Sequence, residues 1–215
     1  MPDPRQQPPR QPEAVTLVRH GAHSATPAPP HEPRTTVPTH ALYAAEPIAS
    51  HTVPWTYEHA PSQTITRPAT LADYDAVNQL HDRSSLASRF ARYQSARRDL
   101  RFAEWSHLTN PDRAGSWVSH PPHSPHDVVA TMNLVRTTDS STAELGLLIE
   151  DGWQGRGLGT ALAAQARATA QNLGCSSLVV VTGADNVRML KIMRGLGATP
   201  TRTGGTTLAF SLPVA

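Results

Sequence analysis

The 215 residues suffice for one domain of ordinary size, or for a domain of about 150 residues with a tail. A net charge of only +2, without a dense basic patch, argues against nucleic acid as the main partner. The single cysteine, Cys175, excludes an intramolecular disulfide and a cysteine-based metal framework.

The prolines divide the chain into two parts. Roughly two-thirds of the 20 prolines precede Ser62, in segments such as 7–12 and 27–31 that have no hydrophobic period. Such segments cannot bury enough apolar surface to offset the entropy lost on ordering. The sequence therefore predicts a disordered Pro/His-rich leader over residues 1–62 and one folded domain over residues 63–215.

The N-terminal residues lack the apolar stretch of a signal peptide. No segment approaches the roughly 20 apolar residues of a membrane-spanning helix. Together with the single cysteine, these features favour a cytoplasmic protein with no membrane partner.

The first half of the expected domain is mainly helical. Thr64–Thr66 favours a short strand, and the residues after it favour a turn into a helix. From Leu71 to about His107, apolar residues recur at helical spacing, with a new cap candidate at Ser84 and Ser85. This region is expected to form a helix pair.

The second half alternates strands and helices. Apolar, often Val-rich runs predict strands at residues 116–119, 127–136, 143–149, 177–182 and 206–212. Amphipathic patterns predict helices at residues 157–173 and 186–196. The expected order is β, α, α, β, β, β, α, β, α, β, an α/β (α+β) domain with four helices.

A glycine-rich turn, residues 151–160 (DGWQGRGLGT), follows the expected strand 143–149 and opens a helix. Glycines let backbone N–H groups approach an anion, and a helix N-terminus adds unpaired donors and a positive dipole end. No Lys-Ser/Thr pair follows as in a P-loop, and the third small residue of a dinucleotide fingerprint would fall on Thr160. The turn is interpreted as a pyrophosphate cradle, the alternative being a purely structural turn.

Gln154-x-x-Gly157-x-Gly159 matches the (Gln/Arg)-x-x-Gly-x-(Gly/Ala) motif, and residues 64–212 resemble the GNAT acetyltransferases. The resemblance implies the GNAT fold, a mixed and mostly antiparallel sheet splayed between its fourth and fifth strands. It also implies acetyl-CoA as co-substrate and no metal. The residues that it assigns to acetyl-CoA binding are Leu148, Ile149, Gln154, Gly155, Arg156, Gly157, Leu158, Gly159, Thr160 and Asn186.

Residues 186–198 are similar to a second GNAT segment, Asn-x-x-Ala-x-x-x-Tyr-x-x-x-Gly-Phe. Asn186 and Gly197 match it, whereas Ala198 replaces the phenylalanine. Met193 stands where many members carry a tyrosine that protonates the departing thiolate, and a thioether has no proton to donate. A phenolic general acid is therefore not expected there. Asn186 also suits a helix cap, which is a structural role.

Residues 85–90 and 143–157 are similar to bacterial protein-lysine acetyltransferases that modify acyl-CoA synthetases. This likeness places Glu144 at the strand glutamate proposed as their base. An amine with a pKa of about 10 is mostly protonated at neutral pH, so its attack on a thioester needs a base. The alternative for Glu144 is a solvent-facing carboxylate or a structural ion pair. Backbone N–H groups near Leu147 to Ile149 are expected to stabilise the oxyanion.

The expected reaction is direct transfer of an acetyl group from acetyl-CoA to a primary amine, on a protein lysine or a small molecule, by a monomer or homodimer. One alternative is a GNAT-like module that binds acyl-CoA as a sensor without turnover. Another is a histidine phosphatase, because residues 15–21 resemble the strand and Arg-His-Gly motif of that family.

Two other candidates favour structural roles. The histidines of the leader and of the segment His120 to His126 could bind a metal, but they are more typical of loop residues. Cys175 lies between a helix end and an expected strand, where a lone cysteine is typically a small hydrophobe rather than a nucleophile.

Overall fold

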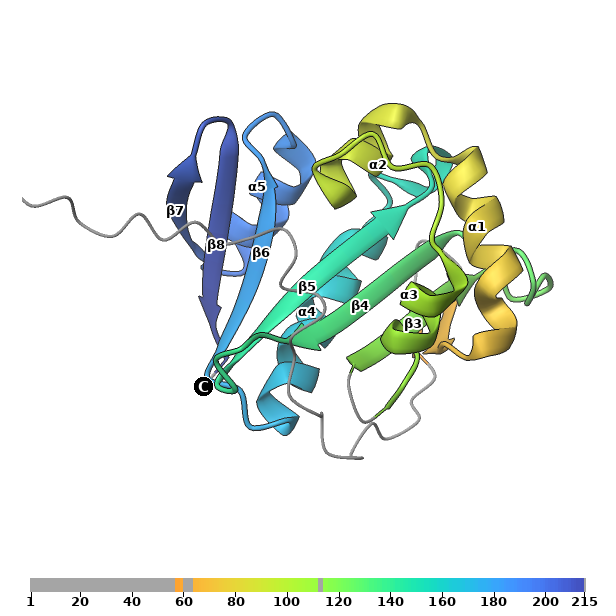
Figure 1. Cartoon of the computed structure of the whole chain (residues 1–215), viewed down its shortest axis with the longest axis horizontal. Coiled ribbons are helices and arrows are strands. Elements are labelled where there is room, and N and C mark those ends of the chain that lie inside the picture. The colour runs from red at the N-terminus through yellow and green to blue at the C-terminus, as the bar shows by residue number, and fades with distance from the viewer. Residues whose placement is uncertain (1–56, 60–63, 112–113, 215) are drawn as a thin grey trace, which may run out of the picture. The chain divides into compact units, whose positions relative to one another are not determined.

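Alternating and continuous apolar runs assemble into one eight-stranded sheet in the computed structural model, which describes residues 57–59, 64–111 and 114–214 (Figure 1). The strand order is β1-β2-β3-β4-β5-β6-β8-β7, and every neighbouring pair is antiparallel except β5 and β6. The strands are β1 Tyr57–His59, β2 Thr64–Pro68, β3 Ala114–His120, β4 Ala130–Arg136, β5 Thr142–Ile149, β6 Ser177–Gly183, β7 Thr199–Gly204 and β8 Thr207–Pro213.

Helices cover both faces of this sheet (Figure 1). On one face, α2 contacts β5 and β6, and α3 contacts β3; on the other, α4 packs on β4, β5 and β6 and contacts α5. The helices are α1 Tyr74–Arg83, α2 Leu86–Tyr93, α3 Phe102–Leu108, α4 Leu158–Asn172 and α5 Val187–Gly195, with 3₁₀ turns η2 Leu71–Asp73 and η3 Asp151–Trp153.

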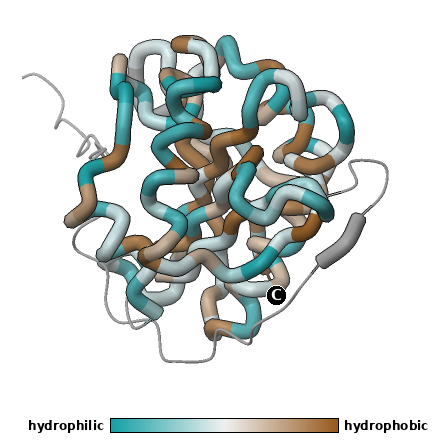
Figure 2. The backbone as a smooth tube through the Cα atoms, turned by 90° about the vertical axis from the view of Figure 1, so that its right-hand side faces the viewer, coloured by the Kyte–Doolittle hydropathy of each residue, from teal (hydrophilic) through white to brown (hydrophobic). Residues whose placement is uncertain are grey.

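Two hydrophobic clusters hold the layers together, one on each face of the sheet. Three fully buried alanines of α4, Ala163, Ala166 and Ala170, let this helix lie close to the sheet. On the opposite face, Trp105 of α3 packs with Leu80 of α1 and with strand residues. In Figure 2 many of the hydrophobic segments lie toward the centre of the domain, and hydrophilic segments are frequent along its outline.

The sheet divides between β5 and β6. Thr142–Glu144 of β5 pair in parallel with Ser177–Val179 of β6. Beyond these pairs, β5 remains paired with β4 only, and β6 remains paired with β8 only. The two halves diverge in Figure 1, with β6, β7 and β8 on one side and β3, β4 and β5 on the other. The mixed, mostly antiparallel sheet splayed between the fourth and fifth expected strands is therefore confirmed.

The number of helices differs from the expected four. The region expected to be a helix pair forms three helices, because α2 ends at Gln94, whose φ of 51° is left-handed, and a new helix starts after Arg101. The sequence analysis also missed β7, which contains Pro200 and Gly204 and lacks an apolar alternation.

The first strand, β1, precedes Gln63, where the sequence analysis places the start of the domain. The rest of the expected leader, including Arg19-His20-Gly21, lies outside the described residues. Within the described part of the chain, no helix is both long enough and apolar enough to span a membrane.

Candidate functional site

A cleft of about 2210 Å³ opens where β5 and β6 separate. Its walls come from α2, the second half of β5, the turn before α4, the end of β6 and the start of α5. Since α2 contacts both β5 and β6, this helix covers the split from one face of the sheet. The topology thus brings the glycine turn and the strand carboxylate Glu144 to one cleft.

The glycine turn forms one wall of the cleft. Gly155 and Gly157 have φ values of 74° and 90°, a left-handed conformation that glycine adopts without strain. Helix α4 starts after Gly157, whose carbonyl accepts from the N–H of Ala161, so the N–H groups of residues 158–160 have no acceptor within the helix. Added to the positive end of a 15-residue helix, these donors fit a pyrophosphate.

Hydrogen bonds anchor the turn to α2. The Gln154 Nε2 donates to the carbonyl of Ile149 (2.8 Å) and to Ser88 Oγ (2.9 Å). The Asp151 carboxylate accepts from the N–H and the hydroxyl of Ser85, both at 2.8 Å, and from Ser88 Oγ. Burial acts to raise the pKa of Asp151, but these hydrogen bonds outweigh burial and lower it below its usual value. Gln154 therefore orients the turn through its side chain.

Most residues expected to bind acetyl-CoA lie together on the cleft wall, namely Leu148, Ile149, Gln154, Gly155, Gly157, Gly159, Thr160 and Asn186. Arg156 and Leu158 do not line the cleft. The Arg156 guanidinium lies 5.2 Å from the ring centre of Trp153, and the Leu158 side chain is buried in the core. Only the backbone of Leu158 is thus available to a ligand.

Asn186, at the start of α5, has a structural role. Asn186 Oδ1 accepts from the N–H of Met189 (3.2 Å), and its Nδ2 donates to Thr182 Oγ1 (2.9 Å). Asn186 therefore caps α5 and ties it to β6. Met193, further along α5, is fully buried in the core and does not line the cleft.

Glu144 lies at the point where the sheet divides. It pairs with Val135 of β4 and with Val179 of β6, the last parallel pair before the strands separate. No hydrogen bond or ion pair joins its carboxylate to another described residue. Burial raises the pKa of Glu144, and the nearby positive charge of Arg92 offsets part of this rise. A half-buried, unpaired carboxylate in a cleft is suited to accept a proton.

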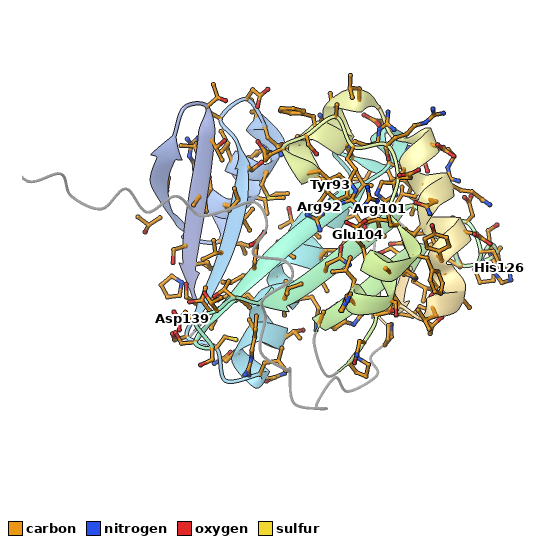
Figure 3. The ribbon with its side chains drawn as sticks, viewed as in Figure 1. Arg92, Tyr93, Arg101, Glu104, His126 and Asp139 are labelled. Atoms are coloured by element: carbon orange, nitrogen blue, oxygen red, sulfur yellow. The ribbon has the colours of Figure 1, made fainter. Side chains whose placement is uncertain are left out.

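Beside Glu144, α2 places a polar cluster that was not expected from the sequence. Figure 3 shows Arg92 and Tyr93 of α2 with Arg101 and Glu104 over the face of β4 and β5. The signal in the sequence is Gly146, an isolated glycine inside a strand, which often marks the close approach of another group.

The candidates assigned to structural roles lie elsewhere. His126 is at the edge of the domain, far from the cleft cluster (Figure 3). Among the described residues, no group of three or more His, Cys, Asp or Glu side chains could hold a metal ion. Cys175 is buried, and this burial raises the pKa of its thiol, which disfavours a nucleophilic thiolate.

Comparisons with known proteins identify the family. The family model described as Acetyltransferase (GNAT) domain matches residues 63–199. The GNAT domain of S. lividans PAT superposes with a TM-score of 0.63 at 20% identity, over 70% of this chain and 90% of that one. The protein yncA from Salmonella typhimurium, solved with its cofactor acetyl-CoA, gives 0.57 at 20% identity over 71% and 95%.

A cAMP-binding acyltransferase from Mycobacterium smegmatis gives a TM-score of 0.52 at 23% identity, over 76% of this chain and 48% of that one. The chain thus spans about half the length of that protein. No curated protein matches the sequence. At these identities the solved structures establish the fold, whereas the family model covers more than half of the sequence. The chain therefore belongs to the GNAT acetyltransferase family.

Proposed function

We propose that the protein is an N-acetyltransferase that moves an acetyl group from acetyl-CoA directly to a primary amine. The observation that carries this proposal is the cleft at the sheet split, which joins the glycine turn before α4 to the unpaired carboxylate of Glu144. Binding of a diphosphate and removal of a proton are the two tasks that such a transfer requires.

Acetyl-CoA fits the first part of the cleft. The turn at Gly155 and Gly157, with the free N–H groups at residues 158–160, binds the pyrophosphate in this proposal. Leu148 and Ile149 line the open part of β5, and in this proposal their backbone meets the acyl group. The same fold in yncA, a structure that contains acetyl-CoA, supports this choice of co-substrate.

Glu144 performs the proton transfer. The neutral amine attacks the thioester carbon, the C–N bond forms, and Glu144 takes the ammonium proton directly or through water. Backbone N–H groups near the end of β5 stabilise the oxyanion while the C–S bond breaks. The proton passes to the departing thiolate, so that the products are an amide and CoA, and Glu144 regains its charge. Met193 takes no part because it is buried.

The acceptor is a primary amine, on a protein lysine or on a small molecule. The similarity of residues 85–90 and 143–157 to protein-lysine acetyltransferases favours the first. We further propose that the enzyme is cytoplasmic and acts as a monomer or homodimer.

A turnover assay separates this proposal from a sensor that binds acyl-CoA without chemistry. Release of the CoA thiol is followed with the purified protein, acetyl-CoA and a panel of amines. The proposal predicts amine-dependent release that falls strongly in Glu144→Gln, whereas acetyl-CoA binding without release for any amine would indicate the sensor.

A further inference from the structure

The guanidinium of Arg92 occupies a space on the sheet that only a glycine leaves open. A Cβ built on Gly146 would lie 2.1 Å from Arg92 Cζ and 2.2 Å from its Nη2. Gly146 and Glu144 are two residues apart on β5, so they share one face of the strand at a separation of roughly 6.7 Å. The cleft thus presents a guanidinium beside the proposed base.

A buried hydrogen-bond network orients this arginine. Arg92 Nη2 donates to Asn133 Oδ1 (3.2 Å), Asn133 Nδ2 donates to Ser116 Oγ (2.9 Å), and Ser116 Oγ donates to the carbonyl of Leu108 (2.5 Å). Asn133 and Ser116 are only 3% and 6% exposed. Because Asn133 Nδ2 is bonded to Ser116, Asn133 Oδ1 faces Arg92.

An aromatic ring supports the same arginine. The Tyr93 ring centre lies 4.9 Å from Arg92 Cζ and 5.1 Å from Arg97 Cζ. Buried His81 donates from Nδ1 to the Val77 carbonyl (2.7 Å), so its Nε2 accepts from the Tyr93 hydroxyl (2.6 Å). The ring is therefore fixed under the two guanidinium groups.

Arg92 has partners that position it, and within the described residues no carboxylate forms a direct ion pair with it, although its charge acts on the nearby Glu144. Arg97 forms an ion pair with Glu104, whereas Arg92 forms none within 4.0 Å among the described residues. Its Nε is buried without a hydrogen-bond partner in that part of the chain. Among the described residues only Asn133 accepts from the terminal nitrogens of Arg92, through Nη2, so Nη1 and the second N–H of Nη2 have no acceptor there. A fixed guanidinium with two such donors is suited to bind a carboxylate through two hydrogen bonds.

We propose that Arg92 binds an anionic group of the acceptor, which is therefore a small amine with a carboxylate or similar oxyanion close to its amino group, as in an α-amino acid. This inference rests on the proposed acetyl transfer, and it selects the small-molecule acceptor in place of the protein lysine that the similarity of residues 85–90 and 143–157 favours. The amine then lies at Glu144 while the oxyanion lies at Arg92, the two groups that β5 presents side by side. A lysine within a protein carries no carboxylate near its ε-amine and lacks this second contact.

The test compares matched acceptors. The α-amino acids that carry a primary amine, the corresponding α-amino acid amides and a lysine-containing peptide are assayed for CoA release with wild type, Arg92→Gln, Arg92→Lys and Arg98→Gln. Arg98 is exposed and outside the cleft, so Arg98→Gln is the charge-matched control.

For wild type and Arg98→Gln we expect kcat/KM to favour the acid over its amide by about 10- to 100-fold, the effect of charged hydrogen bonds. In Arg92→Gln this ratio falls toward one through a higher KM for the acid. Arg92→Lys keeps the positive charge but lacks the paired N–H donors of the guanidinium, so it gives an intermediate ratio. The ratio is insensitive to a change at Glu144, which alters both acceptors equally.

Calorimetry with acetyl-CoA on each variant distinguishes the two proposals. Absence of acetyl-CoA binding to the wild type would remove the acetyltransferase assignment itself. Three results would overturn the inference about Arg92 in a protein that does bind acetyl-CoA. They are equal rates for the acid and its amide, acetylation of the lysine peptide alone, and no acetylation of any amino acid. The wild-type comparison decides the matter even where a substituted protein fails to fold.

Discussion

Replacement of Gly146 by alanine tests the packing of Arg92 on the sheet. The new Cβ would lie 2.1 Å from Arg92 Cζ, so the guanidinium must leave its position. Because it is the end of a flexible side chain, the cost arises from the lost bond to Asn133 rather than from the clash. A hydrogen bond to a charged group contributes about 1.5–3 kcal/mol to stability. Alanine recovers about 0.5–1 kcal/mol of that loss by restricting the unfolded chain.

The net decrease in the free energy of unfolding is therefore about 0.5–2.5 kcal/mol, or roughly 1–10 °C in Tm. Urea unfolding followed by circular dichroism measures it. Gly152→Ala is the control, since a Cβ at Gly152 meets nothing within 4 Å, and it should raise the free energy of unfolding by about 0.5–1 kcal/mol through the same effect on the unfolded chain. In an Arg92→Ala background, Gly146→Ala should no longer destabilise. The proposed packing of Arg92 would be refuted if Gly146→Ala left the free energy of unfolding of the wild type unchanged. It would also be refuted if Gly146→Ala lowered this free energy equally in both backgrounds.

Three further predictions concern the glycine turn, the base and a buried ion pair. Gly157→Glu places a negative charge and a side chain at a left-handed position in the phosphate wall, so calorimetry should detect no acetyl-CoA binding, while Gly152→Glu should retain it. Glu144→Gln should lower kcat by about 10²- to 10⁴-fold with acetyl-CoA affinity unchanged. Since burial raises the pKa of Glu144, the folded state holds its proton more tightly, and Glu144→Gln should be more stable than wild type at neutral pH, a difference that disappears below pH 4.5, the ordinary pKa. Asp73 accepts two hydrogen bonds from Arg67, at 2.6 and 2.9 Å, and although burial opposes the effect, its pKa is lowered. Asp73→Asn should therefore destabilise the protein by about 1–3 kcal/mol at neutral pH, and the difference should shrink as acid protonates Asp73 below its ordinary pKa of 3.8. Equal pH profiles for Asp73→Asn and wild type would contradict this role.

The parts of the site that lie close in sequence could be predicted from it. Gln154, Gly157 and Gly159 belong to one turn, and strand, turn and helix follow one another there, so their spacing and the resemblance to the GNAT motif were enough to locate the glycine turn that lines the cleft. Leu148, Ile149, Thr160 and Asn186 also lie on the cleft wall, and their place there follows from the order of the strands and helices. Arg156 and Leu158 differ because the helix start turns their side chains away from the cleft.

The acceptor side could not be predicted in this way. Arg92 meets Asn133 and Gly146 across 41 and 54 residues, which depends on how α2 crosses the split sheet. The left-handed Gln94, which ends α2, has no sequence signal comparable to a glycine, and its side-chain amide donates to the carbonyls of Phe90 and Ala91 in the same helix. The isolated Gly146 inside β5 is a sequence feature that could have indicated a group packed against this strand.

The central claim is that the cleft between β5 and β6 binds acetyl-CoA, and calorimetry of the purified wild type against Gly157→Glu tests it most directly. Micromolar binding of acetyl-CoA to the wild type, lost in Gly157→Glu, is the predicted result. No heat of binding with the wild type, or equal binding by both proteins, would contradict the account.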